Sequence, residues 1–378
     1  MKETLEVGIL GATGMVGSEY VRMLTNHPWF KIKYVIGKRS AGKKFRESNE
    51  WVSSYEPPRD IAEMTVLEAR PEEQRADMFF SCLPTEAARE LEPLYAKYYP
   101  TYSDASAYRM EPDIPLIIPE VNPGSWELIK QQKSRGWAGF LTTGPNCTAI
   151  GLNLTLKPLH DEFKIKKIVV ATMQAVSGAG FPGVPSISII DNVIPYIKDE
   201  EEKLVTETNK LLGKYVNGRV EFANIDVAAM CNRVPTIDGH METVYLETEK
   251  MITPEDAKEV LRSFKGLPQE LKLPTAPEHP IIVREEPDRP QTRLDRLAGS
   301  VPGMSVVVGR VRRGIDDHSI RYTLLSHNTI RGAAGNTILT AELFYREGWM
   351  FDKRENKEAF KNHQEWQNSL RSNGSWSQ

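Results

Sequence analysis

A glycine-rich turn between two short apolar stretches constrains the fold of this chain more than any other feature of the sequence. The turn reads Gly11-Ala12-Thr13-Gly14-Met15-Val16-Gly17. It follows residues Leu5 to Leu10, which predict a buried strand, and it opens Met15 to Leu24, whose apolar spacing predicts a helix. Glycine at this junction lets the backbone approach a pyrophosphate, and the free amides of the helix N-terminus donate to it. The alternative is a tight turn without a ligand, and the flanking strand and helix weigh against it.

The residues that follow predict a doubly wound parallel sheet. A second strand is predicted at Lys33 to Ile36, so strand, helix and strand follow one another as in a right-handed crossover. Further elements are predicted at Met78 to Phe80, Glu86 to Tyr98 (a helix), Leu116 to Ile118 and Phe140 to Thr143. We therefore expect an α/β, Rossmann-type nucleotide-binding domain over residues 1–145.

The end of the second predicted strand indicates which dinucleotide is bound. An NAD site usually has an acidic residue there for the ribose hydroxyls, and this chain has Gly37-Lys38-Arg39-Ser40 instead. A guanidinium and a hydroxyl suit a 2′-phosphate, so the sequence predicts NADP. Lys38 and Arg39 as ordinary solvated charges are the alternative, and dual use of NAD stays open.

After residue 145 the pattern changes to that of an α+β domain with a mixed or antiparallel sheet, which we place at residues 146–331. Its predicted elements are helices at Thr148 to Leu159, Glu200 to Leu212 and from Thr253 as N-cap, strands at Ile168 to Gln174 and Glu242 to Thr248, and an antiparallel pair at Ser305 to Val311 and Ile320 to Leu325. A helix at Gly335 to Tyr345 is expected to return to the first domain, within a segment at 332–350. Residues 351–378 are a polar tail that we expect to be frayed.

Composition favours a small-molecule enzyme of the cell interior. The 378 residues carry 48 basic and 51 acidic side chains, a balance that gives no field for nucleic acid or an anionic membrane. The cysteines, Cys82, Cys147 and Cys231, lack the spacing of a disulfide framework or a metal site. The chain shows neither a signal peptide before Gly11 nor an apolar span of about 20 residues. We expect a cytoplasmic protein without a metal.

Cys147 is the candidate nucleophile. It lies in Gly-Pro-Asn-Cys-Thr at the first turn of a predicted helix, where the dipole stabilises the thiolate. A free cysteine is more often an inert buried residue, and Cys82 and Cys231 fit that description or the lining of a cofactor pocket. A thiol nucleophile needs a proton-transfer partner, and His240 in Asp-Gly-His offers one. Arg233 offers a fork for a carboxylate, although spacing alone does not show that these groups meet.

Several motifs together resemble the aspartate-semialdehyde dehydrogenase family in its archaeal and fungal form. They run in the family's order and cover all but the tail. These motifs are the glycine turn, Arg39-Ser40, Pro145-Asn146-Cys147-Thr148, Gln174-Ala175-Val176-Ser177-Gly178-Ala179-Gly180, Asn232-Arg233-Val234-Pro235, Asp238-Gly239-His240 and Asn328-Thr329-Ile330-Arg331-Gly332-Ala333-Ala334-Gly335.

The resemblance implies a role for each matching residue. Cys147 attacks the substrate carbonyl, His240 is the general acid and base at near-neutral pH, and Gln174 orients the substrate. The implied substrate contacts are Arg233 for the α-carboxylate, Glu200 for the amine, Arg109 and Lys203 for phosphate, and Asn146. The implied cofactor contacts are Gly11, Thr13, Gly14, Met15, Val16, Gly17, Arg39, Ser40, Ser177, Gly178 and Asn328. For Lys203 the alternative is a solvated helix start.

The implied reaction is the NADPH-dependent conversion of aspartyl phosphate to the semialdehyde through a cysteine thioester, by a homodimer or homotetramer. The nearest alternative on the same scaffold is a reductase of malonyl-CoA, which shares the glycine turn and the stretch Leu273-Pro274-Thr275-Ala276-Pro277. Reductases of that kind differ from the family motifs around Asn146-Cys147 and around Asn232 to Pro235, and this chain keeps both motifs. An N-acetylglutamyl phosphate reductase fits the motifs less well. A non-catalytic NADP-binding sensor is the alternative from another class, and it has no need of Cys147, His240 and Arg233 together.

Overall fold

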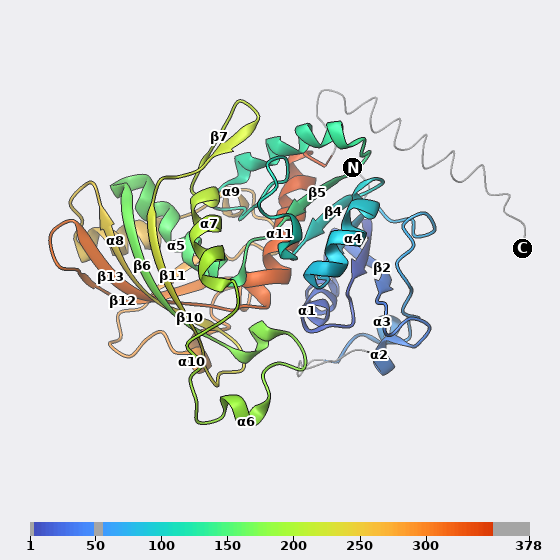
Figure 1. Cartoon of the computed structure of the whole chain (residues 1–378), viewed down its shortest axis with the longest axis horizontal. Helices are drawn as coiled ribbons and strands as arrows, with labels where there is room; N and C mark the ends of the chain where they lie inside the picture. Colours follow the sequence, from blue (N-terminus) through green and yellow to red (C-terminus); the bar gives the residue numbers. More distant parts are fainter. Residues whose placement is uncertain (1–3, 49–55, 351–378) are drawn as a thin grey trace, which may run out of the picture.

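The computed structural model describes residues 4–48 and 56–350, which form two main sheets with helices packed on them. Figure 1 shows the N-terminal sheet and its helices, in blue and cyan, on one side of the molecule. The second sheet, in green to orange, lies on the other side. The predicted fold class, a parallel doubly wound sheet with an α+β partner, is confirmed.

The first sheet has five strands, all parallel, in the order β2-β1-β3-β4-β5. They are β1 (Leu5–Leu10), β2 (Phe30–Ile36), β3 (Met78–Ser81), β4 (Pro100–Ser103) and β5 (Phe140–Thr143). The strand order reverses between β1 and β3, because β2 is added on one side of β1 and β3 on the other. In sheets of this kind ligands bind at the carboxyl ends of the strands next to such a reversal, and the glycine turn that follows β1 lies there.

Alternating side chains along β3 show that both faces of this sheet are covered. Met78 and Phe80 pack with α1 (Met15–Leu24), whereas Phe79 packs on the opposite face against Tyr95 of α4 (Thr85–Ala96). A strand buried on both faces is what crossover helices produce in a parallel sheet. The shorter helices of this part are α2 (Phe45–Ser48), α3 (Arg59–Ala62) and η1 (Ser106–Tyr108), and a 3₁₀ segment, η2, covers Pro123–Arg135.

The last described helix returns to the first sheet. A π-helical turn, η4 (Ile330–Ala334), leads into α11 (Gly335–Glu347). Ile338, Ala341 and Phe344 of α11 lie in the same core cluster as β1 and α1, and the Phe344 ring lies 5.7 Å from the ring of Tyr102 on β4. Residues more than two hundred positions apart therefore share one core.

The second sheet is mixed and has six strands in the order β11-β12-β13-β10-β6-β9. The pairs β6–β9 and β11–β12 are parallel and the other three are antiparallel. The strands are β6 (Ile165–Gln174), β9 (Asp226–Arg233), β10 (His240–Thr248), β11 (Ile281–Val283), β12 (Val306–Arg313) and β13 (Ser319–Ser326). A separate hairpin joins β7 (Lys214–Val216) and β8 (Arg219–Glu221).

One face of the mixed sheet is covered by α5 (Cys147–Phe163), α7 (Glu200–Leu211) and α8 (Pro254–Ser263). Helix α8 starts at the predicted N-cap, Thr253, which forms a capping box with Asp256. The remaining short helices are η3 (Val176–Ala179), α6 (Ser186–Ile189), α9 (Leu267–Glu270) and α10 (Thr292–Asp295). Within the described residues, every helix is too short or too polar to cross a bilayer.

One predicted strand is wrong. Leu116 to Ile118 form no strand beyond an isolated bridge between Leu116 and Thr143. The side chain of Asn122 accepts from the Ile118 amide at 3.0 Å and donates to the Leu116 carbonyl at 2.8 Å. A side chain thus satisfies backbone groups that a neighbouring strand would otherwise pair. The predicted tail at 351–378 lies outside the described residues.

Candidate active site

Cys147 is the first residue of α5 and lies where the two domains meet. The preceding residue, Asn146, is the N-cap, and its side chain accepts from the amides of Thr148 and Ala149 at 2.9 and 3.3 Å. This cap fixes the first turn of the helix and with it the backbone of the cysteine. A Cβ at Gly332 would lie 2.8 Å from Cys147 Cβ, so only glycine fits where η4 passes the nucleophile.

The thiol of Cys147 faces the imidazole of His240 across 93 positions of sequence. Its Sγ lies 3.3 Å from His240 Nε2. His240 is the first residue of β10 and is fully buried. The other ring nitrogen, Nδ1, accepts from the amide of Ala175 at 3.1 Å. The structure therefore brings together the two residues that the sequence proposes as nucleophile and acid–base group.

Arg233 joins this pair from the end of β9. Its Nη1 donates to the Ala175 carbonyl at 2.7 Å, and the residue is 7% exposed. A Cβ at Gly178 would lie 2.8 Å from Arg233 Nη1 and 3.1 Å from His240 Nε2. Gly178 therefore passes close over both groups, and a side chain there would displace one of them.

The protonation of the pair differs from what the helix position predicts. Burial raises the pKa of the Cys147 thiol to about 12, with the Glu200 carboxylate adding to the rise and Arg109 and Arg233 opposing it. Burial and the nearby charge of Arg233 lower the pKa of His240 to about 3. Both shifts favour the neutral forms, a thiol on Cys147 and an unprotonated ring on His240. The position of Cys147 at the helix N-terminus acts in the opposite direction and favours the thiolate.

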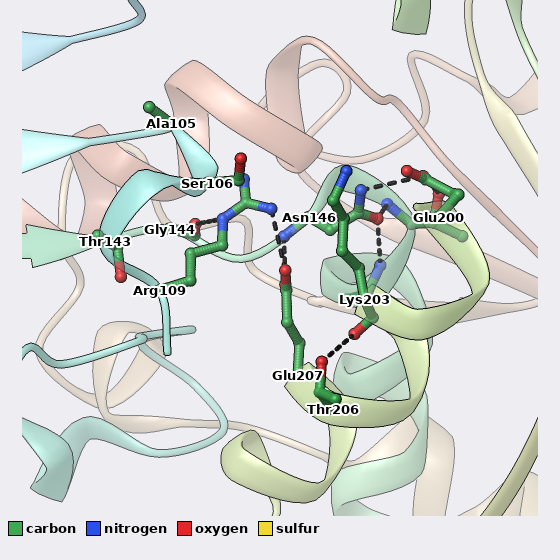
Figure 2. Close-up of polar contacts among 12 residues, drawn as sticks. Ala105, Ser106, Arg109, Thr143, Gly144, Asn146, Glu200, Lys203, Thr206 and Glu207 are labelled. Carbon is green, nitrogen blue, oxygen red and sulfur yellow. Dashed lines mark hydrogen bonds and ion pairs between the residues drawn. The ribbon is translucent and has the colours of Figure 1, made fainter. Parts of the chain in front are cut away.

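Helix α7 presents a row of charged side chains to the turn before Cys147 (Figure 2). Glu200 Oε1 accepts from Asn146 Nδ2 at 2.9 Å and from Thr148 Oγ1 at 3.3 Å. Glu207 Oε2 accepts from the backbone N–H of Asn146 at 2.6 Å. Lys203 extends from the helix toward Asn146 in the same view. The predicted substrate contacts Asn146, Glu200 and Lys203 therefore lie on one side of Cys147.

Arg109 comes from the first domain and reaches the same row. Its guanidinium donates to Glu207 Oε1 at 3.0 Å, to the Gly144 carbonyl at 2.9 Å and to the Asp104 carbonyl at 2.7 Å. Three of its five N–H groups are used in this way, and two remain for a ligand. The buried ammonium of Lys210 donates to the Arg109 carbonyl at 2.6 Å, which fixes the backbone that carries the guanidinium.

Glu207 and Lys210 are site residues that the sequence reasoning missed. Their spacing from Glu200 and Lys203 was the available signal, because positions 200, 203, 207 and 210 lie on one face of a helix. The run of charges looked like a solvated surface. In the structure Glu200, Glu207 and Lys210 are buried.

The other predicted contacts surround the pair. Gln174, at the end of β6, is buried, and its Nε2 lies 3.3 Å from Thr172 Oγ1. Asn328 donates to Ser177 Oγ at 2.8 Å and accepts from the Gly239 amide at 2.8 Å. In this conformation Asn328 therefore ties the loop after β6 to the turn before His240.

The glycine turn has the geometry of an open helix N-terminus. Gly11 adopts a φ of 83°, which favours glycine, and a Cβ at Gly17 would lie 2.4 Å from the Ala12 carbonyl oxygen. Helix α1 begins without a side-chain cap and without an acidic residue in its first turn. Beside it Thr13 Oγ1 lies 3.0 Å from Ser40 Oγ, and Arg39 is exposed at the rim.

Glu242 lies behind His240 on the same face of β10 and gives a pH-dependent prediction. It is 0% exposed, and neither carboxyl oxygen has a hydrogen-bond partner among the described residues. Burial, then the charge of Glu200, raises its pKa well above the ordinary value. The folded state therefore holds this proton tightly, and its stability falls as the pH rises above the unfolded pKa of about 4.3.

Glutamine at position 242 does not titrate, so it removes this loss of stability with rising pH. We expect the free energy of unfolding of E242Q, relative to the wild type, to increase by about 1.4 kcal/mol for each pH unit above the unfolded pKa of about 4.3. Urea unfolding at three pH values between about 5.5 and 7.5 measures the difference. E247Q, on the same strand but paired with Lys167 at the surface, is the control and should show a flat difference. A flat difference for E242Q as well would contradict a neutral Glu242.

Comparison with known proteins shows the family of this chain. The semialdehyde dehydrogenase NAD-binding domain matches residues 6–129, and the semialdehyde dehydrogenase dimerisation domain matches residues 156–331. A curated aspartate-semialdehyde dehydrogenase of Archaeoglobus fulgidus is 51% identical over 90% of this chain and 98% of its own length. The chain belongs to the aspartate-semialdehyde dehydrogenase family.

Two further relatives bear on cofactor and substrate. The crystal structure of aspartate-semialdehyde dehydrogenase with NADP from Candida albicans superposes with a TM-score of 0.83, at 36% identity, over 92% of this chain and 99% of that one. A malonyl-CoA reductase (NADP) of Metallosphaera sedula is 43% identical over 94% of this chain and all of its own length. Members of the aspartate-semialdehyde dehydrogenase family and a reductase with another acyl donor thus share this scaffold.

Proposed function

We propose that this chain is an aspartate-semialdehyde dehydrogenase that converts L-aspartyl 4-phosphate to L-aspartate 4-semialdehyde with NADPH, through a thioester on Cys147. The observation that carries the proposal is the meeting of Cys147, His240 and Arg233, with Sγ 3.3 Å from Nε2. A nucleophile, a proton-transfer group and a carboxylate fork within one buried site are what acyl transfer from an amino-acid phosphate requires.

Each side chain takes a role that suits its chemistry. Cys147 attacks the acyl carbon, and His240 supplies a proton at Nε2 to the developing charge. Arg233 holds the α-carboxylate, and Glu200 holds the ammonium group. The remaining contacts are Arg109 and Lys203 for the phosphate, with Gln174 and Asn146 orienting the acyl group.

The residues around the glycine turn fit NADP. The uncapped N-terminus of α1 offers amides to a pyrophosphate. Gly11 and Gly17 allow the turn to pack closely against Cys82 and the start of α1. Ser40 and Arg39 suit the 2′-phosphate. Ser177, Gly178 and Asn328 are the other proposed cofactor contacts. When bound, NADPH supplies the hydride that reduces the thioester.

Arg39 should set the preference for NADPH over NADH. We expect R39A to raise KM for NADPH about tenfold, the value of roughly 1.4 kcal/mol, because it removes a charged donor from the 2′-phosphate. The KM for NADH should stay within about twofold, because NADH has no such group. Steady-state kinetics with both cofactors measure the ratio, and K38A is the matched control. Equal effects on both cofactors would count against this role.

The acyl donor is tested directly by comparing two substrates. We expect NADPH oxidation with aspartyl phosphate, and phosphate-dependent reduction of NADP with aspartate semialdehyde. Malonyl-CoA reduction is the second candidate, and the 43% identical reductase favours testing it. Oxidation of NADPH with malonyl-CoA and none with aspartyl phosphate would reverse the assignment.

We also infer the division of the chain and its assembly. Residues 1–145 with 332–350 form the NADP-binding domain and 146–331 the catalytic and dimerisation domain. Exposed apolar side chains gather on and near edge strand β9, among them Met230, Ile190 and Tyr196. Such a surface is typical of a subunit interface and supports a homodimer or homotetramer, which light scattering would measure. We place the enzyme in the cytoplasm.

A further inference from the structure

The carboxylate of Glu207, on α7, joins two parts of the candidate site. Its Oε1 accepts from Arg109 Nη1 at 3.0 Å, and its Oε2 accepts from the backbone N–H of Asn146 at 2.6 Å. The residue is 2% exposed, and Figure 2 shows its side chain between the guanidinium and the turn before Cys147. One side chain therefore connects Arg109, from the first domain, to the N-cap of the helix that carries the nucleophile.

We propose that Glu207 is a positioning residue for the phosphate step of the reaction. It holds the guanidinium of Arg109 at a fixed place relative to the turn before Cys147, so that phosphate and sulfur reach the same carbonyl carbon. This role rests on the proposed function, which takes Arg109 as a contact of the phosphate. It adds a residue that acts on the phosphate only through another side chain.

The contacts of Arg109 explain why its guanidinium depends on Glu207. Its Nε donates to the Gly144 carbonyl at 2.9 Å, and its Nη2 donates to the Asp104 carbonyl at 2.7 Å. Both of these acceptors are neutral backbone groups, whereas the acceptor of Nη1 is a carboxylate. A hydrogen bond between two charged groups is roughly twice as strong as one between neutral groups. Glu207 is therefore the strongest of the three anchors, and it is the one that a substitution can remove.

The backbone next to Glu207 is held in place, so its carboxylate is a rigid support. The following residue, Thr208, accepts from Asn153 Nδ2 of α5 at 3.0 Å. One turn of α7 further along, Lys210 Nζ donates to the Arg109 carbonyl at 2.6 Å and to two more carbonyls of the same loop. Helix α7 is thus fixed both to the helix of the nucleophile and to the loop of the arginine.

Cys147, in contrast, keeps its place without Glu207. The side chain of Asn146 accepts from the next two free amides of α5 at 2.9 and 3.3 Å. Its Nδ2 donates to Glu200 Oε1 at 2.9 Å. These bonds fix the first turn of α5 independently, so the loss of the Glu207 carboxylate should affect Arg109 more than Cys147.

Glutamine cannot replace this carboxylate. A carboxylate accepts hydrogen bonds at both oxygens, whereas a carboxamide has one acceptor oxygen and an NH₂ group that only donates. In E207Q the NH₂ group would face either Arg109 Nη1 or the N–H of Asn146, and both of these are donors. The variant keeps the size of the side chain and loses one of the two bonds together with the charge.

The oxidation of aspartate semialdehyde separates the two steps that the proposal distinguishes. The thioester on Cys147 forms first, and this step needs no phosphate. An oxygen of hydrogen phosphate then attacks the thioester carbon, the C–S bond breaks, and the proton of hydrogen phosphate reaches the sulfur through His240. The products are the acyl phosphate and the free thiol, so atoms and charge balance.

Stopped-flow and steady-state kinetics of E207Q test the proposal. We expect the first turnover of NADPH formation, without phosphate, to stay within about threefold of the wild type. The value of kcat/KM for phosphate should fall about tenfold to a hundredfold, because a displaced guanidinium no longer aligns the phosphate with the carbon. Equal losses in both measurements, or wild-type values in both, would overturn the proposal.

Two further variants show whether Glu207 acts through Arg109. In the R109A background E207Q should change kcat/KM for phosphate by less than about twofold, because the group that it positions is already absent. A full additional loss would contradict the proposal. E202Q is the matched control, since Glu202 lies on the exposed side of the same helix, and it should keep wild-type kinetics in both steps.

A crystal structure of the wild-type enzyme with inorganic phosphate decides the matter if E207Q does not fold. We expect phosphate on Arg109 while Glu207 still bridges Arg109 and Asn146, and a Glu207 that releases the bound arginine would overturn the proposal. A wild type without phosphate-dependent turnover would refute the proposed function, and this role with it. Normal wild-type turnover together with an unaffected E207Q would refute the positioning role alone.

Discussion

Replacing Cys147 with alanine is expected to lower kcat by about 10⁴-fold or more, because the covalent route is lost when its nucleophile is removed. The polar contact of the thiol is with His240 at 3.3 Å, and the smaller alanine side chain fits beside Gly332 without a clash. Binding of NADPH and the melting temperature should therefore stay close to those of the wild type. Stopped-flow kinetics and cofactor fluorescence measure the two properties separately.

Cys231→Ala is the matched control, since this buried thiol lies on β9 outside the proposed site. It should keep kcat within about threefold and lose about 1 kcal/mol of stability at most. Full turnover by C147A would remove the enzymatic proposal and leave the NADP-binding sensor as the better description.

Replacing Arg331 with methionine should destabilise the fold by about 3–5 kcal/mol, because it leaves a buried carboxylate without its partner. Arg331 and Glu120 are both 0% exposed and form a bidentate pair with distances of 2.9 and 2.6 Å. The pair joins η4, at the end of the second domain, to the loop after Ile118 in the first. Urea unfolding at neutral pH measures the loss.

A second substitution, at the ion-pair partner Glu120, is the control for this prediction. In the double variant E120Q/R331M no charge is left buried, so at least half of the lost stability should return. The surface pair of Lys157 and Asp161 is a second control. We expect K157M to lower the free energy of unfolding by less than about 1 kcal/mol. Equal losses in the single and the double variant would show that packing, and not the unpaired charge, carries the effect.

Local signals in the sequence predicted the elements that depend on local chemistry. β1 and α1 have the predicted bounds because an apolar run, a glycine turn and a helical periodicity follow one another without interruption. β4 was missed because four residues beginning with proline carry no such signal, although the parallel neighbours β3 and β5 make them a strand. Leu116 to Ile118 fail in the opposite sense, since the Asn122 side chain pairs with the Ile118 amide and the Leu116 carbonyl.

The sequence proposes the members of the candidate site but does not show how they are arranged. Spacing does not show that Cys147, His240 and Arg233 meet, because their meeting depends on the parallel register of β6 with β9 and the antiparallel register of β6 with β10. The resemblance supplied the residues, and the registers place them. Neither predicts the pKa shifts of the pair, because these depend on burial and on the charges of Glu200, Arg109 and Arg233, which come from other elements.

The return of α11 to the first sheet has a consequence for synthesis on the ribosome. The strands made first lack the side chains of Ile338, Ala341 and Phe344 until the last described helix has emerged. Roughly 190 residues separate Thr143 from Gly335, so at about 5–20 residues per second the nascent chain waits on the order of 10–40 s for this helix. The catalytic domain, whose segments are continuous, is complete before its N-terminal neighbour. During translation the core of the catalytic domain can therefore close before the core of the N-terminal domain, although the N-terminal strands are made first.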